Sequence, residues 1–192
     1  TGVQTCALPI SVEMQDAIAR VNDMHVQEGR PVFKTGIGVN YGQVIVGNIG
    51  SQKKMDYTII GDPVNYGSRL EGLTKTYHQD IIISKSIFRK VRDQLPTRFL
   101  DFVQAKGKTT GQSIYTVKLR LTDEEKQGWK IYHEGIRRFY QRRFEHARAY
   151  FRKTLQHIPD DWLAREYVAR CDRYMAAPPP EDWNGVNIMT SK

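Results

Sequence analysis

The chain begins its regular patterning with apolar residues at helical spacing over residues 12–28, which predicts one amphipathic helix. Gly29 and Pro31 follow this stretch, and both residue types are typical of a helix end. The helical spacing of apolar residues then ends. In the run "FKTGIGVNYGQVIVGNIG", two β-rich segments flank the turn residues "NYG". We expect this run to form an antiparallel hairpin.

Further helices and strands follow up to about residue 120. The run "DYTIIG" predicts a strand, and Asp62 with Pro63 predicts the N-cap and first residue of a helix that reaches about Tyr77. Next come a buried strand at "DIIIS", a short helix at "SKSIFRKVRDQL", and two strands, "TRFLDFVQAKG" and "QSIYTVKL", that we expect to pair across "GKTTG". Because helices alternate with mostly antiparallel strands, the pattern predicts an α+β fold.

The pattern becomes almost entirely helical over residues 121–176. Thr122 and Glu125 have the spacing of a capping box at the start of the first helix. One tetratricopeptide-like repeat, followed by a lone helix at residues 161–175, fits the spacing of four small or packing residues: Gly135, Ala147, Phe151 and Pro159. Residues 177–192 contain three consecutive prolines and predict an extended C-terminal tail, which Trp183 would anchor.

Several large aromatic residues fall within this helical segment. A single repeat cannot bury its apolar face alone, so we expect these side chains to pack on one another and on the preceding domain rather than to line a peptide groove. They are Trp129, Tyr132, Phe139, Phe144 and Trp162.

Composition narrows the class of protein to a globular one. An apolar content of 40% in 192 residues suffices for one full domain and a small second one. The formal charge of +8 fits a nucleic-acid partner, but Lys and Arg are spread along the chain without a basic block or an interleaved aromatic platform, and a small polyanionic ligand explains part of the charge equally well. We expect no nucleic-acid partner. No apolar run reaches membrane-spanning length, no signal-peptide pattern is present, and Cys6 and Cys171 lack disulfide or metal spacing. We therefore expect a cytoplasmic domain, either of a soluble protein or of a longer membrane-anchored protein that carries this domain on its cytosolic side.

The first ten residues, "TGVQTCALPI", lack the periodicity of the segment that follows them. They resemble the in-frame translation of a common sequencing adaptor, so we interpret residues 1–10 as a non-native, adaptor-derived segment and exclude them from the fold prediction. The alternative is an ordinary disordered terminus. The coding DNA distinguishes the two, because codons unlike the adaptor would contradict the first interpretation.

The stretch "VNYGSR" places Asn65 and Arg69 four residues apart at the start of a predicted helix, and therefore on one helix face. The guanidinium fork suits phosphate oxygens, and the amide offers both a donor and an acceptor to a sugar or phosphate ester. Taken alone, the pair fits either a nucleotide site or an ordinary solvated helix face.

The run from residue 33 to residue 117 resembles the C-terminal half of a class III nucleotidyl cyclase catalytic domain, the adenylate and guanylate cyclase family. Three motifs occur in family order: "GIGVNYGQVIVGNIGS" resembles the glycine-rich hairpin, "YTIIGDPVNYGSRLEGL" the substrate and transition-state segment, and "VQAKGK" with "SIYTV" the lysine hairpin. The resemblance implies an N-terminally truncated, ferredoxin-like α+β cyclase domain over residues 11–120. It also implies a homodimer in which each active site takes residues from both subunits.

The resemblance implies roles for particular residues. Arg69 would stabilise the charge that develops as the ribose 3′-hydroxyl attacks the α-phosphate, and Asn65 would hydrogen-bond the ribose and fix the attack geometry. Lys106 matches the lysine that contacts the terminal phosphates, with Lys108 as the second candidate; without the resemblance both fit a charged hairpin turn. Thr58 occupies the base-reading position, where threonine accompanies adenine in the family, so the implied substrate is ATP.

The family's two metal-binding aspartates belong to the half of the domain that precedes this chain, so we expect the ligands of Mg²⁺ or Mn²⁺ to lie upstream. Asp56 and Asp62 are the nearby acids, and loop and N-cap positions explain them better. The resemblance therefore implies an adenylate cyclase that forms cyclic AMP and pyrophosphate, of which this fragment alone is inactive. The alternative is a non-catalytic, nucleotide-sensing or scaffolding domain, which an absence of the upstream aspartates would support.

Overall fold

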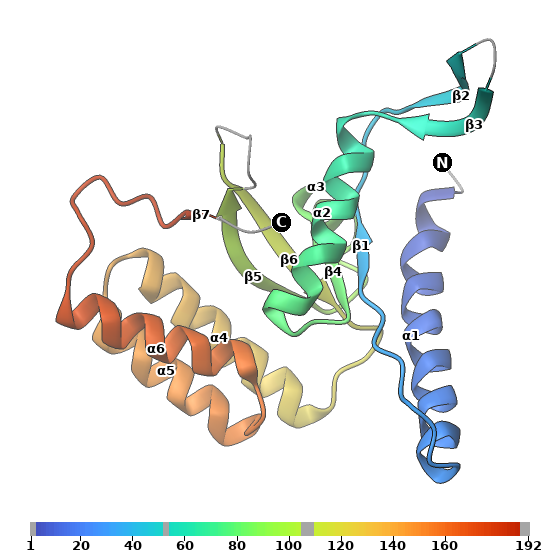
Figure 1. Ribbon diagram of the computed structural model, residues 1–192. Coiled ribbons are helices and arrows are strands. Elements are labelled where there is room, and N and C mark those ends of the chain that lie inside the picture. The colour runs from blue at the N-terminus through green and yellow to red at the C-terminus, as the bar shows by residue number, and fades with distance from the viewer. Residues whose placement is uncertain (1–2, 52–53, 105–109, 189–192) are drawn as a thin grey trace. The chain divides into compact units, whose positions relative to one another are not determined.

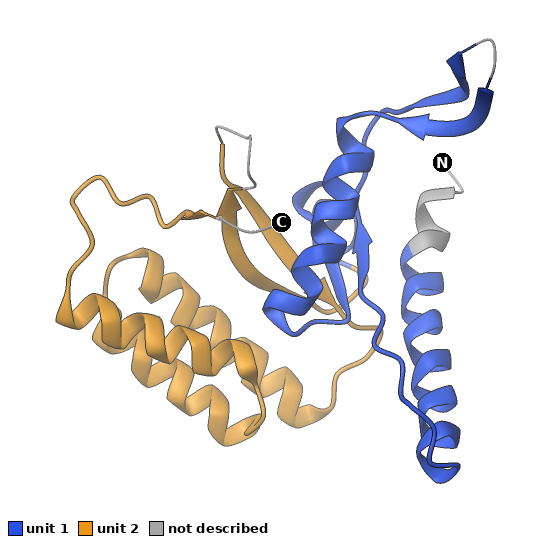
Figure 2. Ribbon diagram, in the orientation of Figure 1, with its two compact units in different colours: residues 1–93, 192 blue, residues 94–191 orange. Residues whose placement is uncertain are grey.

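The computed structural model describes residues 3–51, 54–104 and 110–188, drawn as a ribbon in Figure 1. The chain divides into two compact units, residues 1–93 with 192 and residues 94–191 (Figure 2). Both units combine helices with strands, so the predicted α+β class is confirmed. No helix in these described ranges is both long and apolar enough to cross a bilayer.

The first unit is built around a parallel pair of strands covered by a helix. Its elements are α1 (Val3–Gln27), β1 (Ile37–Val39), β2 (Ile45–Ser51), β3 (Lys54–Ile60), α2 (Asp62–Tyr77), β4 (Ile81–Ser84) and α3 (Lys85–Val91). β1 and β4 pair in parallel, with Ile37 opposite Ile81, and α2 packs on both strands. β2 and β3 form a separate antiparallel hairpin, with Ile45 opposite Ile60.

The hairpin predicted for residues 33–50 is wrong, because its two β-rich runs belong to different strand pairs. β1 is not followed by a strand that pairs with it. Instead, the Asn40 side-chain amide donates to the Pro63 carbonyl at 3.0 Å and so connects the end of β1 to the start of α2. The place beside β1 is taken by β4, all four residues of which are buried. A short apolar strand is typical of parallel pairing under a covering helix.

Two helix starts differ from the prediction. α1 begins at Val3, with Leu8 only 3% exposed, so the helix includes most of the segment interpreted as adaptor-derived, and the origin of that segment stays a prediction. α2 is capped by Gly61 and not by the predicted Asp62, which is its first residue. Gly61 has a φ of 148°, a value that favours glycine, and its carbonyl accepts a hydrogen bond from the Asn65 N–H at 3.3 Å.

The second unit joins a strand hairpin to three helices. Its elements are β5 (Thr97–Gln104), β6 (Gln112–Val117), α4 (Asp123–Tyr140), α5 (Phe144–His157), α6 (Trp162–Ala176) and β7 (Asn187–Ile188). The predicted pairing of β5 with β6 is confirmed, and a bulge lies between Phe99 and Asp101. β7, which the sequence pattern did not indicate, pairs in parallel with the end of β5.

The helices of the second unit share an aromatic core, as predicted. Tyr132 is fully buried, Phe139 is nearly so, and Trp162 is half-buried. The predicted capping box of α4 is also confirmed, since Glu125 N–H donates to Thr122 Oγ1 at 3.2 Å and Thr122 N–H donates to the Glu125 carboxylate at 3.0 Å. The assignment of α4 and α5 to a tetratricopeptide-like repeat stays a prediction.

Candidate active site

Asn65 and Arg69 lie one turn apart on the exposed face of α2. Asn65 belongs to the first turn of the helix, where backbone N–H groups and the helix dipole favour negative charge. Arg69 adds a planar fork of donors on the same face. The geometry therefore offers an amide and a guanidinium side by side to an anionic ligand.

The opposite face of α2 is buried and fixes the position of this pair. Leu70, Thr74 and Tyr77 are the buried residues of the helix. Across from them, a Cβ atom on Gly38 would overlap the Gly67 carbonyl oxygen and the Glu71 amide nitrogen of α2. β1 and α2 thus approach each other so closely that only glycine fits between them, which leaves the helix little freedom to shift.

Asn40, which the sequence pattern indicated only as a turn residue, helps to position α2 and α3 relative to β1. Besides its bond to Pro63, its carbonyl oxygen accepts a hydrogen bond from Ser86 Oγ at 3.3 Å, and the same hydroxyl donates to the Tyr41 carbonyl at 3.2 Å. Asn40 therefore links the end of β1 to the first turns of α2 and α3. An amide directly after a strand and near a Gly-rich run was the signal available in the sequence.

Tyr66, the neighbour of Asn65 in α2, differs from it in environment. Burial raises the pKa of Tyr66 to about 12, and its hydroxyl finds no hydrogen-bond partner in the part of the chain that the structure describes. The phenol therefore stays protonated near neutral pH and is not a candidate general base.

Thr58 lies on β3, opposite Gly47 of β2, and its side chain is exposed. The β2–β3 hairpin extends beyond the first turn of α2 (Figure 1), so Thr58 is carried by a different element from Asn65 and Arg69. Lys106 and Lys108 lie outside the described residues, between the end of β5 and the start of β6. Of the predicted site residues that the structure describes, Asn65 and Arg69 share one element and Thr58 lies on another.

The hairpin carries exposed apolar side chains on both of its faces, Ile45 on one and Val46, Met55, Tyr57 and Ile59 on the other. Ile45, Met55 and Tyr57 are 66%, 62% and 76% exposed, and Val46 and Ile59 are half exposed. Exposed apolar side chains gathered on a two-stranded hairpin are typical of a surface that another protein surface covers.

The residues present do not fit a Mg²⁺ or Mn²⁺ site. Among the described residues, no three His, Cys, Asp or Glu side chains are grouped so that they could hold a metal ion. Asp56 has a 70% exposed side chain that lies 3.9 Å from Lys54, and Asp62 belongs to the first turn of α2. Hard divalent cations need several oxygen ligands around one point, and these two acids do not supply them.

The comparisons with known proteins agree on one family. A family model described as the adenylate and guanylate cyclase catalytic domain matches residues 3–119. An adenylate cyclase from Anabaena cylindrica is 39% identical over 124 residues, which are 61% of this chain and 25% of that protein. Adenylate cyclase 1 from Rhizobium meliloti is 33% identical over 112 residues, which are 58% of this chain and 16% of that protein. The chain thus spans a quarter or less of these curated relatives.

Solved structures give the same result. The adenylyl cyclase CyaB from P. aeruginosa matches with a TM-score of 0.54 and 28% identity, over 62% of this chain and 61% of that chain. A bacterial light-regulated adenylyl cyclase matches with a TM-score of 0.51 and 30% identity, over 60% of this chain and 57% of that chain. Because the family model covers more than half of the chain, this chain belongs to the adenylate and guanylate cyclase catalytic domain family.

Proposed function

We propose that this chain is the substrate-binding and transition-state half of an adenylate cyclase, which converts ATP to 3′,5′-cyclic AMP and pyrophosphate. The observation that carries the proposal is the exposed Asn65 and Arg69 pair on α2, held in place by the close glycine contact with β1. Relatives named as adenylate cyclases support the proposal that ATP is the substrate. We call the longer protein, in which the family's metal-binding half precedes this chain, the full-length cyclase.

In the proposed reaction the ribose 3′-hydroxyl gives up its proton to solvent as its oxygen forms a bond to the α-phosphorus. The bond from that phosphorus to the bridging oxygen breaks, and pyrophosphate leaves with the electron pair. Arg69 stabilises the negative charge that grows on the phosphoryl oxygens and the leaving group. Asn65 hydrogen-bonds the ribose and holds the 3′-oxygen in line for attack.

Two further residues complete the proposed substrate site. Thr58 contacts the adenine edge, because a hydroxyl can both donate and accept a hydrogen bond there. Lys106 neutralises the terminal phosphates as a point charge. The metal, Mg²⁺ or Mn²⁺, would be held by residues upstream of this chain and would neutralise the phosphates of the bound nucleotide.

The partner we propose is a second copy of the cyclase domain. The exposed apolar side chains of the β2–β3 hairpin support a homodimer, because they remain uncovered among the residues that the structure describes. Cytoplasmic ATP is the substrate pool that fits such an enzyme, so we also propose a cytoplasmic location for the domain.

Complementation tests this assignment. The 192-residue chain, inactive alone, is mixed and refolded with a full-length cyclase that carries Arg69→Ala, so that one composite site in a mixed dimer regains the arginine. We expect cyclic AMP to form from ATP, and the same chain carrying Arg69→Ala to give none. Equal activity from the chain with and without Arg69, or metal-dependent activity from the chain alone, would contradict the proposal.

A further inference from the structure

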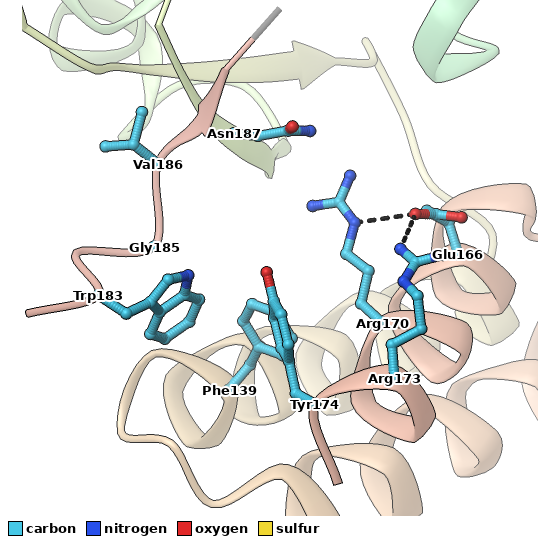
Figure 3. A pocket seen from close by; sticks show the side chains of 9 residues that line it. All are labelled: Phe139, Glu166, Arg170, Arg173, Tyr174, Trp183, Gly185, Val186 and Asn187. Atoms are coloured by element: carbon cyan, nitrogen blue, oxygen red, sulfur yellow. Dashed lines mark hydrogen bonds and ion pairs between the residues drawn. The ribbon is translucent and has the colours of Figure 1, made fainter. Parts of the chain in front are cut away.

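A cavity of about 190 Å³ in the second unit is lined by α4, α6 and the segment that leads to β7 (Figure 3). Its two arginines are paired with carboxylates of the same unit: Arg170 and Arg173 lie 2.9 and 3.2 Å from Glu166, and Arg170 lies 2.7 Å from the buried Asp101. Trp183 packs on aromatic rings of α4 and α6, as its predicted role as an anchor requires. The charges at this cavity are therefore balanced within the fold.

The first turn of α2, in the first unit, lacks a capping side chain. Its N-cap residue is Gly61, which has no side chain to accept a hydrogen bond from the first N–H groups of the helix. Helix ends fray when such groups have no partner. Asn65 belongs to this turn, so its position depends on contacts that come from outside the helix.

Asn40, directly after β1, supplies such a contact. Its side-chain nitrogen donates to the Pro63 carbonyl at 3.0 Å. One turn further along α2, a Cβ atom on Gly67 would meet the Asn40 Cβ at 3.9 Å, which is an ordinary van der Waals contact. The Asn40 side chain therefore lies along the turn that carries Asn65.

The Asn40 amide is itself held in one orientation. Because the Pro63 carbonyl can only accept a hydrogen bond, the amide nitrogen must face it, and the amide oxygen faces Ser86. Ser86 Oγ lies 3.3 Å from this oxygen and 2.8 Å from Ser84 Oγ at the end of β4. Ser84 is buried and caps α3, so the network connects Asn40 to a fixed part of the fold.

The residues that follow Asn40 also fit closely against their neighbours. A Cβ atom on Gly42 would lie 2.5 Å from Pro63 Cγ, so the backbone here approaches the proline ring more closely than another residue type would allow. The Tyr41 ring lies 4.3 Å from Lys90 Nζ of α3, at cation–π distance. Asn40 therefore has little freedom to move away from α2.

We propose that Asn40 is a positioning residue for the cyclase reaction and acts through Asn65. The proposal rests on the proposed function of Asn65. The bond from Asn40 to Pro63 holds the first turn of α2, so that the Asn65 amide meets the ribose in the geometry that in-line attack requires. A misplacement of about 1 Å can cost as much as a hundredfold in rate without any loss of a direct substrate contact. Loss of Asn40 therefore lowers turnover more than it weakens ATP binding.

The test uses two variants of Asn40 and one matched control. Asn40→Ala removes both hydrogen bonds, whereas Asn40→Asp keeps the shape and the oxygen that faces Ser86 and replaces the donor to Pro63 with an oxygen. Asn22→Ala is the control, because Asn22 of α1 also uses both ends of its amide: it donates to the Phe33 carbonyl at 2.8 Å and accepts from the Phe33 N–H at 2.7 Å.

Hydrogen–deuterium exchange on the 192-residue chain supplies the first readout. Exchange in residues 64–69 should be about tenfold faster in both Asn40 variants than in the unmutated chain, because the first turn of α2 opens more often. Residues 123–140 of the second unit should be unchanged, and Asn22→Ala should leave residues 64–69 unchanged.

Kinetics of the full-length cyclase supply the second readout. We expect both Asn40 variants to lower kcat about tenfold, with the KM for ATP within about threefold, and Asn22→Ala to match the unmutated enzyme. In an Asn65→Ala background, Asn40→Ala should change kcat by less than about twofold, because the group that it positions is gone. A role in stability alone would lower kcat by the same factor in both backgrounds.

Three results would overturn the proposal: unchanged exchange in residues 64–69, an unchanged kcat in both Asn40 variants, or an equal loss of kcat with and without Asn65. If Asn40→Ala does not fold, Asn40→Asp takes its place in each comparison. If the unmutated full-length protein makes no cyclic AMP, the proposed function fails, and the exchange result by itself decides whether Asn40 holds the first turn of α2.

Discussion

Replacing Gly38 with alanine is the sharpest test of how α2 is positioned. The new Cβ would overlap two backbone atoms of α2, the Gly67 carbonyl oxygen and the Glu71 amide nitrogen. Backbone atoms cannot rotate away as side chains do, so β1 and α2 would have to separate by roughly 1 Å. Overpacking of this kind costs about 1–3 kcal/mol, and we expect Gly38→Ala to fall at the upper end of that range.

The matched control is Gly72→Ala, on α2 itself. A Cβ on Gly72 would meet no atom within 4 Å, and alanine stabilises a helix interior by up to about 1 kcal/mol relative to glycine. Urea denaturation should therefore move the unfolding midpoint down for Gly38→Ala and slightly up for Gly72→Ala. Because Asn65 and Arg69 move with α2, Gly38→Ala should also lower cyclase turnover in the full-length protein. Equal midpoints for the two variants would refute the close packing of β1 on α2.

Three further predictions concern single contacts. Thr122→Ala removes the cap of α4 and should destabilise the second unit by about 1 kcal/mol in urea denaturation, with Thr122→Ser near neutral. Desolvation around the imidazole and the charge of Arg98 lower the pKa of His133 from 6.5 to about 4, although part of the residue is exposed to solvent. The folding stability should therefore be undiminished above pH 6.5 and fall as the pH drops towards 4, by roughly 1 kcal/mol after solvent screening. The His133→Gln variant should lose this dependence, and a pH profile of stability identical to that of the unmutated protein would count against the assignment. Thr58→Cys should lower the ratio of kcat/KM for ATP to that for GTP about tenfold, and an unchanged ratio would place base reading elsewhere.

Local patterns in the sequence predicted local structure well. The capping box at Thr122, the β5–β6 pairing and the aromatic core of the helices all depend on residues close together in the chain or on burial alone. The parallel pairing of β1 with β4 could not be obtained in this way, because it joins Ile37 to Ile81 across a whole helix. The periodicity of an apolar run indicates a strand but does not choose its partner.

The candidate site, like the fold, could be predicted where it depends on residues close together in the chain and not where it depends on distant ones. Asn65 and Arg69 could be found from the sequence because their i, i+4 spacing fixes a shared helix face. Asn40 was missed, since its importance arises from Pro63 and Ser86, which are distant in the chain. The contact of Asn187 with Asp101 was missed for the same reason, because it depends on how β7 pairs with the end of β5.

The central claim is that Arg69 stabilises the transition state of cyclic AMP formation, and one measurement tests it most directly: ATP turnover by the full-length cyclase and its Arg69→Ala variant at saturating ATP. Loss of a transition-state donor lowers kcat by roughly a hundredfold or more and leaves substrate binding little changed. We therefore predict such a drop in kcat with a KM for ATP within about threefold of the unmutated enzyme, and only partial recovery in Arg69→Lys, which lacks the planar fork. Equal turnover in the Arg69→Ala variant, or a rise in KM without a fall in kcat, would contradict the claim.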